Sequence, residues 1–373
     1  MSPANLPQDS LYRLCSNLSS SNRTVHKIAG ETRRACVAII IRWRRGQYDR
    51  TPIDPNYRPR NWMDFMHDKM VQRDGGYPEI LFIRRAKRAG DPWSGDMAFP
   101  GGRNEEGEND LDTVVREVQE EVGLDLNSND FVKLGCLDDR EITSLLGGKP
   151  FMILSTFGNY LNLDGASCRS ISRHFYLQVS SESPQITRQN SEVAGTHWIP
   201  LHHFLYSRIK TAKPVKLPVL PLSSKLPSFF GTVALPSMLV PVKEETIVLW
   251  GLALTMTSEL VSYTQTTKEI ARHGQVAPLV RMIKAYPKLS QWDLNGFVRL
   301  FCFANSTWRV LKGEKQDYQT NISTSWAGGP SIPDYFASVR RALYVATAVR
   351  ATAGLATGGY LAHKIIKSAY GNR

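Results

Sequence analysis

The sequence predicts an α/β protein with a helical C-terminal extension, and three observations favour this fold class. Short runs rich in β-branched residues recur between residues 36 and 250, as expected of strands. Residues 111–122 have the apolar spacing of an amphipathic helix. Beyond about residue 275, helical stretches alternate with a polar loop at 313–333. We therefore expect a polar N-terminal tail, a main domain and a helical extension, at 1–32, 33–272 and 273–373.

The composition is that of an ordinary globular protein with a basic surface. Hydrophobic residues make up 42% of the 373 residues, charged residues make up 21%, and the net charge is +12. These values exclude a wholly disordered or collagenous chain. A polytopic membrane protein is excluded because no apolar stretch of about 18 residues is free of charge. The positive charge favours anionic partners such as nucleotides, CoA-like cofactors, nucleic acid or acidic lipid.

Five cysteines are scattered along the chain without a CxxC pair: Cys15, Cys36, Cys136, Cys168 and Cys302. An odd, widely spaced set argues against a disulfide framework or a zinc site and favours free thiols. The N-terminal residues lack a long apolar segment and carry few acids. We therefore expect an intracellular, reducing compartment, either cytoplasmic or mitochondrial.

The expected strands follow in order along the main domain. Residues 36–43 form a β-branched run, 80–83 form a second strand, and 97–99 form a short strand that Pro100 ends. Between the first two strands, residues 44–78 carry several prolines and charges and are typical of a long surface insertion. Further elements are expected as strands at 132–137, 151–160, 174–179, 197–199 and 247–250, and as a helix at 251–270.

One helix is defined by both its buried face and its ends. Its apolar residues stand at i, i+3, i+4, i+7 and i+11, namely Leu111, Val114, Val115, Val118 and Val122. Asp110 is a candidate N-cap, and Gly123 stands where a helix-ending glycine belongs. Helical geometry places Glu117, Glu120 and Glu121 together, about 120° from the apolar stripe. We expect one side of this helix to anchor it in the core while another side presents three carboxylates.

Acidic residues are concentrated around this helix. Nine acids and one base fall between residues 105 and 125 of a chain that is otherwise basic. Packed like charges repel each other, and hard oxygen ligands in this number are typical of a Mg²⁺ or Mn²⁺ site. The alternative is a solvated acidic helix face without a ligand.

Residues 102–124 read GRNEEGENDLDTVVREVQEEVGL, and every fixed position matches the pattern Gx5Ex7REUxEExGU, in which U is apolar. This segment resembles the Nudix box of the Nudix hydrolase superfamily. The resemblance implies an α/β/α sandwich with a mixed sheet, and metal-dependent hydrolysis of a nucleoside diphosphate derivative. It implies that Glu117, Glu120 and Glu121 bind Mg²⁺ or Mn²⁺, with the carbonyl group of Gly101 as a further ligand.

The same resemblance gives roles to the other positions of the box. Arg116 would orient the carboxylates, since its guanidinium can reach Glu120 four residues further along the helix. Glu108 would close the junction between loop and helix. The carboxylate that takes the proton from the attacking water would be Glu120 or Glu192, and the alternative for Glu192 is a surface residue in a loop. Two positions would be backbone requirements, Gly102 and Gly123.

The residues before the box resemble the CoA-diphosphatase-like branch of this superfamily. Gly95 and the Phe-Pro-Gly-Gly run at 99–102 fit that branch, as does the Leu-Trp-Gly-Leu run at 249–252. Asp91 stands where the branch has an arginine, and Arg88 lies three positions earlier. The resemblance covers about residues 35–270 and makes CoA or acyl-CoA the leading substrate. The substrate-binding residues that it implies are Arg84, Arg85 and Gly102.

Other substrates and another class of function stay open. Residues 193–242 contain no acid and five Lys or Arg residues, so this stretch either holds an additional phosphate or is a basic surface loop. Within the hydrolase class the alternatives are ADP-ribose, dinucleotides and oxidised nucleotides. A non-catalytic nucleotide- or RNA-binding module would use the +12 charge, although RNA-type aromatic and basic motifs are not evident.

The C-terminal extension contains an Ala/Gly-rich segment at 342–362, with Gly354 and Gly358 four residues apart. A membrane anchor is one interpretation of this segment, and a packed or amphipathic helix is the other. Arg350 inside the segment costs about 2.5–3.5 kcal/mol on insertion scales, so we favour packing. The sequence does not define an oligomeric state.

Overall fold

The computed structural model describes residues 6–20, 34–47, 49, 54, 56–72, 75–88, 94–141, 170–180, 182–205, 215–218, 232–242, 245–265, 288–312 and 332–370. The chain divides into two units. Unit 1 comprises Met1–Thr143, Lys149–Val215 and Leu235–Ala285, and unit 2 comprises Ser144–Gly148, Lys216–Ala234 and Tyr286–Arg373. Unit 2 therefore includes a stretch, 216–234, that lies before the boundary predicted at 272.

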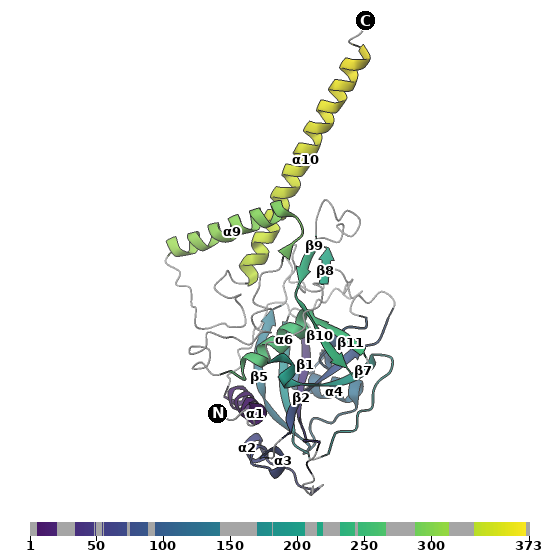
Figure 1. Ribbon diagram of the computed structural model, residues 1–373, viewed down its shortest axis with the longest axis vertical. Helices are drawn as coiled ribbons and strands as arrows, with labels where there is room; N and C mark the ends of the chain where they lie inside the picture. Colours follow the sequence, from purple (N-terminus) through teal and green to yellow (C-terminus); the bar gives the residue numbers. More distant parts are fainter. Residues whose placement is uncertain are drawn as a thin grey trace. The chain divides into compact units, whose positions relative to one another are not determined.

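Unit 1 is built on a seven-stranded mixed sheet in the order β3-β2-β1-β6-β5, with β4 beside β1 and β7 beside β2. Figure 1 labels four of these strands, β1, β2, β5 and β7. The pairing of β1 with β6 is parallel, and the other pairings are antiparallel. The strands are β1 (Ala35–Arg44), β2 (Tyr77–Arg85), β3 (Met97–Ala98), β4 (Gly101–Arg103), β5 (Phe131–Glu141), β6 (Ser170–Gln178) and β7 (Val193–Pro200). Six of the predicted strands are thereby confirmed, whereas the one expected at 151–160 lies outside the described residues.

The central strand β1 is buried on both faces. Ile39, Ile41 and Trp43 point into one apolar cluster. Ala38 and Ile40, on the opposite side of the pleat, point into a second cluster. A strand with two apolar faces must be covered from both sides, and this requirement produces the three-layer arrangement.

Helices cover both faces of the sheet. Helix α4 (Asp110–Val122) packs Val114, Val118 and Val122 onto one face. The other face is covered by α1 (Leu6–Ser19), α6 (Gly251–Ser262) and the hairpin of β10 (Ser237–Val242) and β11 (Glu245–Trp250). The predicted α/β/α sandwich with a mixed sheet is confirmed, and so is the strand expected at 247–250. The helix predicted at 251–270 ends at Ser262, and residues 266–270 lie outside the described part.

Helix α4 begins one residue earlier than predicted. Its N-cap is Asn109, whose side chain accepts hydrogen bonds from the N–H groups of Leu111 and Asp112. Asp110 was expected in this role, but it is the first residue of the helix and forms an ion pair with Arg34 at 3.2 Å. Asn109 and Asp112 form a capping box, which satisfies the free N–H groups of the first turn.

The N-terminal residues are not a tail throughout. Helix α1 occupies residues expected to be polar and unstructured, and its apolar residues at i, i+3, i+4 and i+7 are all buried, namely Leu11, Leu14, Cys15 and Leu18. The prediction failed because Ser and Asn residues around this stripe outweigh its apolar content, although the helical spacing is present.

The expected surface insertion at 44–78 also contributes to the core. It contains α2 (Trp62–Met66) and α3 (Lys69–Gln72), and the first residues of β2. Phe65 and Val71 are almost completely buried. The prolines and charges of this segment therefore lie around a small helical cover for the sheet.

Unit 2 contains two contacting helices and a small sheet. Its helices are α9 (Trp292–Leu311) and α10 (Ile332–Tyr370), and its strands are ordered β12-β9-β8. Arg350 of α10 forms an ion pair with Asp293 of α9, with N···O distances of 2.5–2.8 Å. The remaining bounds are β8 (Val215–Pro218), β9 (Thr232–Leu235) and β12 (Lys288–Leu289).

The C-terminal part of α10 is exposed rather than packed. Buried residues occur up to Ala346, whereas every side chain from 351 to 367 is exposed. The packing expected for the Ala/Gly-rich segment therefore holds only for its first turns, and Arg350 pairs with Asp293 at the end of the packed part. Among the described residues, no helix combines the length and the apolar character that a membrane span requires.

The burial of α1 predicts a measurable contribution to stability. Leu14→Ala should lower the free energy of unfolding by about 2–5 kcal/mol, because Leu14 is fully buried. Leu111→Ala is the matched control, since Leu111 is 36% exposed, and it should cost less than about 1 kcal/mol. Urea unfolding followed by circular dichroism measures both. An unchanged midpoint for Leu14→Ala would mean that residues 6–19 are a tail after all.

Candidate active site

Strand β4 brings two glycines against β1 and α4. Gly101 has φ +144°, and a Cβ atom there would lie 2.2 Å from the carbonyl oxygen of Cys36. Its N–H donates a hydrogen bond of 2.8 Å to Oε2 of Glu121. A Cβ atom at Gly102 would lie 2.4–2.5 Å from the carboxyl atoms of Glu117. Gly101 must be glycine, because its φ is positive and a Cβ atom would meet the main chain, whereas a side chain at Gly102 would displace the Glu117 carboxyl group. Each glycine lies directly against one carboxylate of α4.

Arg116 ties the helix to the loop that precedes it. Its Nε and Nη2 atoms donate to the two carboxylate oxygens of Glu108 at 2.6 and 3.1 Å. Its Nη1 atom donates to Glu117 at 3.0 Å and to Glu120 at 3.2 Å. Nη2 also donates to the carbonyl oxygen of Arg103 at 3.0 Å. The expected contact with Glu120 is present, and the bidentate pair with Glu108 is the shorter one.

Glu108 is surrounded by hydrogen-bond donors. Besides Arg116, it accepts bonds from the N–H of Glu105 at 2.8 Å and from the hydroxyl of Thr113 at 3.0 Å. The bond from Arg116 lowers the pKa of Glu108 to about 2, with smaller contributions from the other two donors. Glu108 therefore stays ionised at neutral pH and closes the junction between loop and helix.

The three carboxylates of α4 differ in their exposure. Glu121 is 3% exposed, and this burial raises its pKa to about 8, with the charges of Glu117 and Glu192 acting in the same direction. Burial also raises the pKa of Glu117, against the opposing effect of Arg116. The side chain of Glu120 is 52% exposed. Two carboxylates of this group are thus withdrawn from water without enough positive charge to balance them.

The loop at 187–192 docks on the C-terminal end of α4. The N–H of Thr187 donates to the carbonyl of Val122 at 2.9 Å, and the N–H of Gln189 donates to the carbonyl of Glu121 at 3.1 Å. Gly123 ends the helix with φ +72°, and a Cβ atom there would lie 2.9 Å from the side chain of Thr187. Gly123 therefore permits both the left-handed end of the helix and the close approach of the loop.

Glu192 lies at the end of this docked loop. Its charge raises the pKa of both Glu117 and Glu121, which places it within electrostatic reach of the carboxylates. Arg88 donates from Nη2 to Oε1 of Glu192 at 2.8 Å and also binds the carbonyl of Ser191. The side chain of Glu192 is 39% exposed. Glu192 is thus a surface residue that a specific ion pair holds beside the carboxylates.

The two arginines at the end of β2 have different surroundings. Arg84 donates from Nη1 to Oε1 of Glu245 at 2.8 Å, which links β2 to β11. The charge of Arg85 lowers the pKa of Glu121, so Arg85 belongs to the surroundings of the carboxylates. Arg85 therefore acts on the carboxylate group through its charge, whereas the ion pair of Arg84 is with Glu245.

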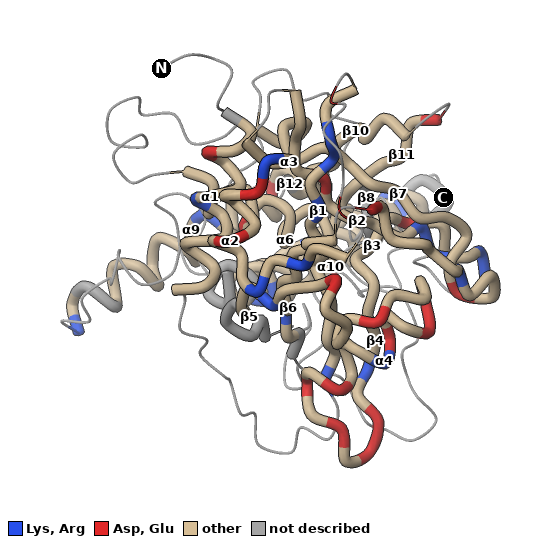
Figure 2. The backbone as a smooth tube through the Cα atoms, turned by 90° about the horizontal axis from the view of Figure 1, so that it is seen from below, with Lys and Arg blue, Asp and Glu red and all other residues tan. Residues whose placement is uncertain are grey.

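Six of the predicted site residues are hydrogen-bonded in two neighbouring sets, and acidic residues gather around β4 and α4 (Figure 2). Arg116 is bonded to Glu108, Glu117 and Glu120, and Gly101 is bonded to Glu121. Within the described ranges, no three His, Cys, Asp or Glu side chains are already arranged as a metal-binding group. In this state Glu117 and Glu120 are bonded to Arg116, and Glu121 is bonded to Gly101.

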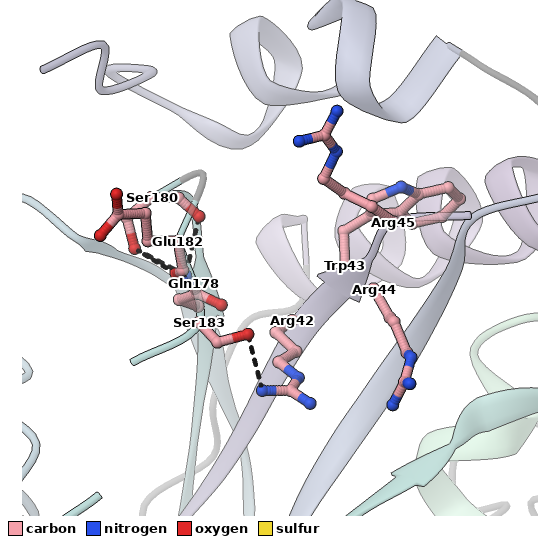
Figure 3. Close-up of a pocket in the computed structure, with 8 residues that line it drawn as sticks. All are labelled: Arg42, Trp43, Arg44, Arg45, Gln178, Ser180, Glu182 and Ser183. Atoms are coloured by element: carbon pink, nitrogen blue, oxygen red, sulfur yellow. Dashed lines mark hydrogen bonds between the residues drawn. The ribbon is translucent and has the colours of Figure 1, made fainter. Parts of the chain in front are cut away.

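A separate pocket of about 340 Å³ opens at the C-terminal end of β1, whereas β4 pairs with the N-terminal end (Figure 3). None of the predicted site residues lines it. Arg42 in its wall pairs with Glu79 at 2.7 Å and stacks over Trp198 at 4.1 Å. Its lining residues are Arg42, Trp43, Arg44, Arg45, Gln178, Ser180, Glu182 and Ser183.

Some supporting residues were not identified from the sequence. Thr113 is fully buried, and its hydroxyl donates to Glu108. The sequence signal for this role was a polar residue beside the apolar stripe of the helix. The pairing of Arg88 with Glu192 joins positions 104 residues apart, and no local pattern reports such a contact. The contribution of Arg103 comes from its main-chain carbonyl, which is independent of residue type.

The ion pair of Glu108 predicts a stability difference that depends on pH. Glu108→Gln should lower the free energy of unfolding at pH 7 by about 1.5–3 kcal/mol, because a charged bidentate pair becomes a neutral one. The folded-state pKa of about 2 lies below the unfolded value of about 4.3. The contribution is therefore complete above the unfolded pKa and is lost as the pH falls through the folded one. Urea unfolding should show the difference between wild type and variant shrinking over that range.

Glu106→Gln is the control for this measurement. Glu106 is exposed in the same loop, so its substitution should change the free energy of unfolding by less than about 0.5 kcal/mol at either pH. Equal stability of Glu108→Gln and wild type at pH 7 would contradict the structural role of the pair.

Comparison with known proteins extends this picture. The family model described as NUDIX domain matches residues 70–222. The uncharacterized protein C14C4.10c of Schizosaccharomyces pombe is 32% identical over 180 residues, which is 48% of this chain. The chain covers 45% of that relative, less than half of its length.

Three solved structures are also similar, at low identity. A C. elegans Ap4A hydrolase is 12% identical, with 45% of this chain and 81% of that chain covered and a TM-score of 0.25. A MutT NUDIX hydrolase from Burkholderia pseudomallei is 20% identical, with 46% and 84% covered and a TM-score of 0.23. A MutT/nudix family protein from Enterococcus faecalis is 10% identical, with 69% and 70% covered and a TM-score of 0.30.

The TM-scores are low, so the assignment rests on the family model and on the residues of the box. The matched residues 70–222 include the complete motif at 102–124 and the docked loop at 187–192. Residues 70–222 of the chain are therefore similar to a NUDIX domain.

Proposed function

We propose that the Nudix domain hydrolyses a diphosphate linkage in a nucleoside diphosphate derivative, with Mg²⁺ or Mn²⁺ as its cofactor. The observation that carries this proposal is the group of Glu117, Glu120 and Glu121 on α4, which Arg116 and the two glycines of β4 hold in place. The proposal includes the activity and the substrate of the whole protein.

The residues of the group fit a divalent cation. Carboxylate and carbonyl oxygens are the ligands that Mg²⁺ and Mn²⁺ prefer. Burial raises the pKa of Glu117 and Glu121, as expected for carboxylates that lack a balancing charge. Glu117, Glu120, Glu121 and the carbonyl of Gly101 would hold the cation. When bound, it would neutralise the diphosphate oxygens and lower the pKa of an attacking water.

The protein's own groups orient the reactants and move a proton. Arg116 restrains Glu117 and Glu120, and the N–H of Gly101 restrains Glu121. The base that takes the proton from the attacking water is Glu120 or Glu192. Their side chains are 52% and 39% exposed, so both can meet water and substrate.

We favour CoA or acyl-CoA as the substrate within this class. The support is the resemblance of residues 95–102 and 249–252 to the CoA-diphosphatase-like branch. The strand β11 and the helix α6, which carry the later segment, lie against β3, which carries the earlier one. The two segments must be neighbours if both contribute to one substrate-binding surface. The basic stretch expected to bind an extra phosphate lies mostly outside the described residues, so that part stays a prediction.

An intracellular, reducing compartment is part of the same proposal. Its support is the scattered set of cysteines, and none of the four described ones forms a disulfide, namely Cys15, Cys36, Cys136 and Cys302.

A substrate panel tests the function. The full-length protein is incubated with Mg²⁺ or Mn²⁺ and with CoA, dephospho-CoA, ADP-ribose, a dinucleotide, an oxidised nucleotide or capped RNA, and the products are identified by mass spectrometry. CoA should give phosphopantetheine and an adenosine bisphosphate. It should be cleaved with a higher kcat/KM than dephospho-CoA if the basic stretch binds the additional phosphate.

Each other outcome of the panel has a distinct meaning. Equal kcat/KM for CoA and dephospho-CoA would contradict the hypothesis that the basic stretch binds an additional phosphate. Preferred cleavage of ADP-ribose, a dinucleotide or an oxidised nucleotide would replace CoA as the substrate. No turnover of any compound with either cation would contradict the hydrolase and favour a non-catalytic binding module.

The carboxylate group predicts the effect of a single substitution. Glu120→Gln should lower kcat at least ~100-fold, about 2.7 kcal/mol in the barrier, with an unchanged circular dichroism spectrum because Glu120 is half exposed and outside the apolar core. Glu106 is another exposed acid, at a variable position of the box, and Glu106→Gln should keep normal turnover. A folded Glu120→Gln enzyme with near-normal kcat would eliminate Glu120 as ligand and as base.

A further inference from the structure

A cysteine and a histidine face each other on neighbouring strands of unit 1, apart from the carboxylate group. Cys136 of β5 is the direct antiparallel partner of His174 of β6, so both side chains project from the same face of the sheet. The Sγ atom of Cys136 lies 3.2 Å from Nδ1 of His174. This distance is within the hydrogen-bond range for sulfur.

Two further polar groups flank the histidine on β6. Residues two apart on a strand share a face, so Ser172 and Tyr176 stand on either side of His174. The Oγ atom of Ser172 lies 2.8 Å from Nε2 of His174. The hydroxyl of Tyr176 is buried and has no hydrogen-bond partner among the described residues. Burial, and to a smaller extent the charge of Cys136, raise the pKa of Tyr176, so its hydroxyl keeps its proton near the sulfur.

The arrangement assigns the protons. If Nε2 of His174 carries a hydrogen and donates it to Ser172, the lone pair of Nδ1 faces Cys136 and can accept the proton of its thiol. A nucleophile, a base and a third group that orients the base are the parts of an activated nucleophile. The Tyr176 hydroxyl adds a hydrogen-bond donor that would stabilise the thiolate.

Cys136 differs from the other described cysteines of unit 1. Cys15 and Cys36 are fully buried, and burial raises the pKa of the Cys15 thiol. Cys136 is a half-buried residue, whereas His174 is 1% exposed. Cys136 is therefore closer to solvent than its base.

We propose that Cys136 is a reactive thiol, deprotonated by His174, that is modified by electrophiles and above all by hydroperoxides. The thiolate attacks one oxygen of the peroxide, an S–O bond forms and the O–O bond breaks. Sulfur is oxidised to sulfenic acid and the peroxide is reduced. The leaving group, hydroxide from hydrogen peroxide or alkoxide from an organic hydroperoxide, takes the proton from Nδ1 of His174 and departs as water or alcohol, which restores the neutral histidine.

Alkylation of the native, full-length protein tests this assignment without substrate or metal. Iodoacetamide is added at a series of pH values, and modification of the Cys136 peptide is followed by mass spectrometry, with the same peptide in urea-unfolded protein as the reference. The native thiol should titrate at least about one pH unit below an ordinary value of about 8.5. Dilute hydrogen peroxide followed by dimedone should label Cys136 at least ~10-fold faster than Cys302. A native profile equal to that of the unfolded protein would overturn the proposal.

Three variants distinguish activation of the Cys136 thiol by His174 from simple exposure of that thiol. His174→Gln should move the titration of Cys136 back toward the unfolded value, and Tyr176→Phe should move it partway. The alkylation of Cys136 can be measured in both variants as long as they fold. If His174→Gln does not fold, Ser172→Ala tests the same network, because it removes only the group that orients the histidine. Unchanged Cys136 reactivity in folded Tyr176→Phe and Ser172→Ala proteins would contradict the assigned roles. None of these measurements depends on diphosphate hydrolysis, so their failure is distinct from failure of the proposed function.

Discussion

One guanidinium group holds the acidic site together. Arg116 bonds Glu108 from the loop, Glu117 and Glu120 from the helix, and the main chain of Arg103 at the end of β4. Nine acids crowd this short stretch of sequence, and without a central cation their repulsion would oppose the helical conformation. The glycines of β4 can lie against Glu117 and Glu121 only because this loop and helix keep a fixed separation. The shape of the site thus depends on Arg116 more than on any single carboxylate.

The sheet supports this site through its own geometry. The strand β1 is buried on both faces, and its N-terminal part pairs with β4, which places Gly101 and Gly102 beside the helix that packs on the same strand. The parallel partner β6 carries Ser172, His174 and Tyr176 on the face toward α4. Two groups with different chemistry, hard carboxylate oxygens and a soft thiol, therefore share one layer of the molecule.

The sequence predicted those parts of the fold and site that are encoded locally. The box fits in 23 residues, and helical geometry relates those of its members that lie on α4, so the contact of Arg116 with Glu120 followed from spacing alone. Glu192 and Arg88 could not be paired from the sequence, because the docked loop at 187–192 brings them together. Cys136 and His174 became neighbours through a strand pairing with irregular register at Gly135, which no periodicity predicts. Helix α1 was missed although its spacing was present, since its burial depends on partners elsewhere in the chain.

The docking of the 187–192 loop on α4 has a consequence for how this domain can change during evolution. Glu192 takes its position from main-chain hydrogen bonds to the end of the helix and from Arg88. It does not depend on the length of the chain segment that leads from β5 to β6. Insertions or deletions between residues 142 and 169 can therefore accumulate in related sequences while the separation of Glu192 from Glu121 stays the same. The arrangement of the carboxylates is in this way independent of the number of residues between these two strands.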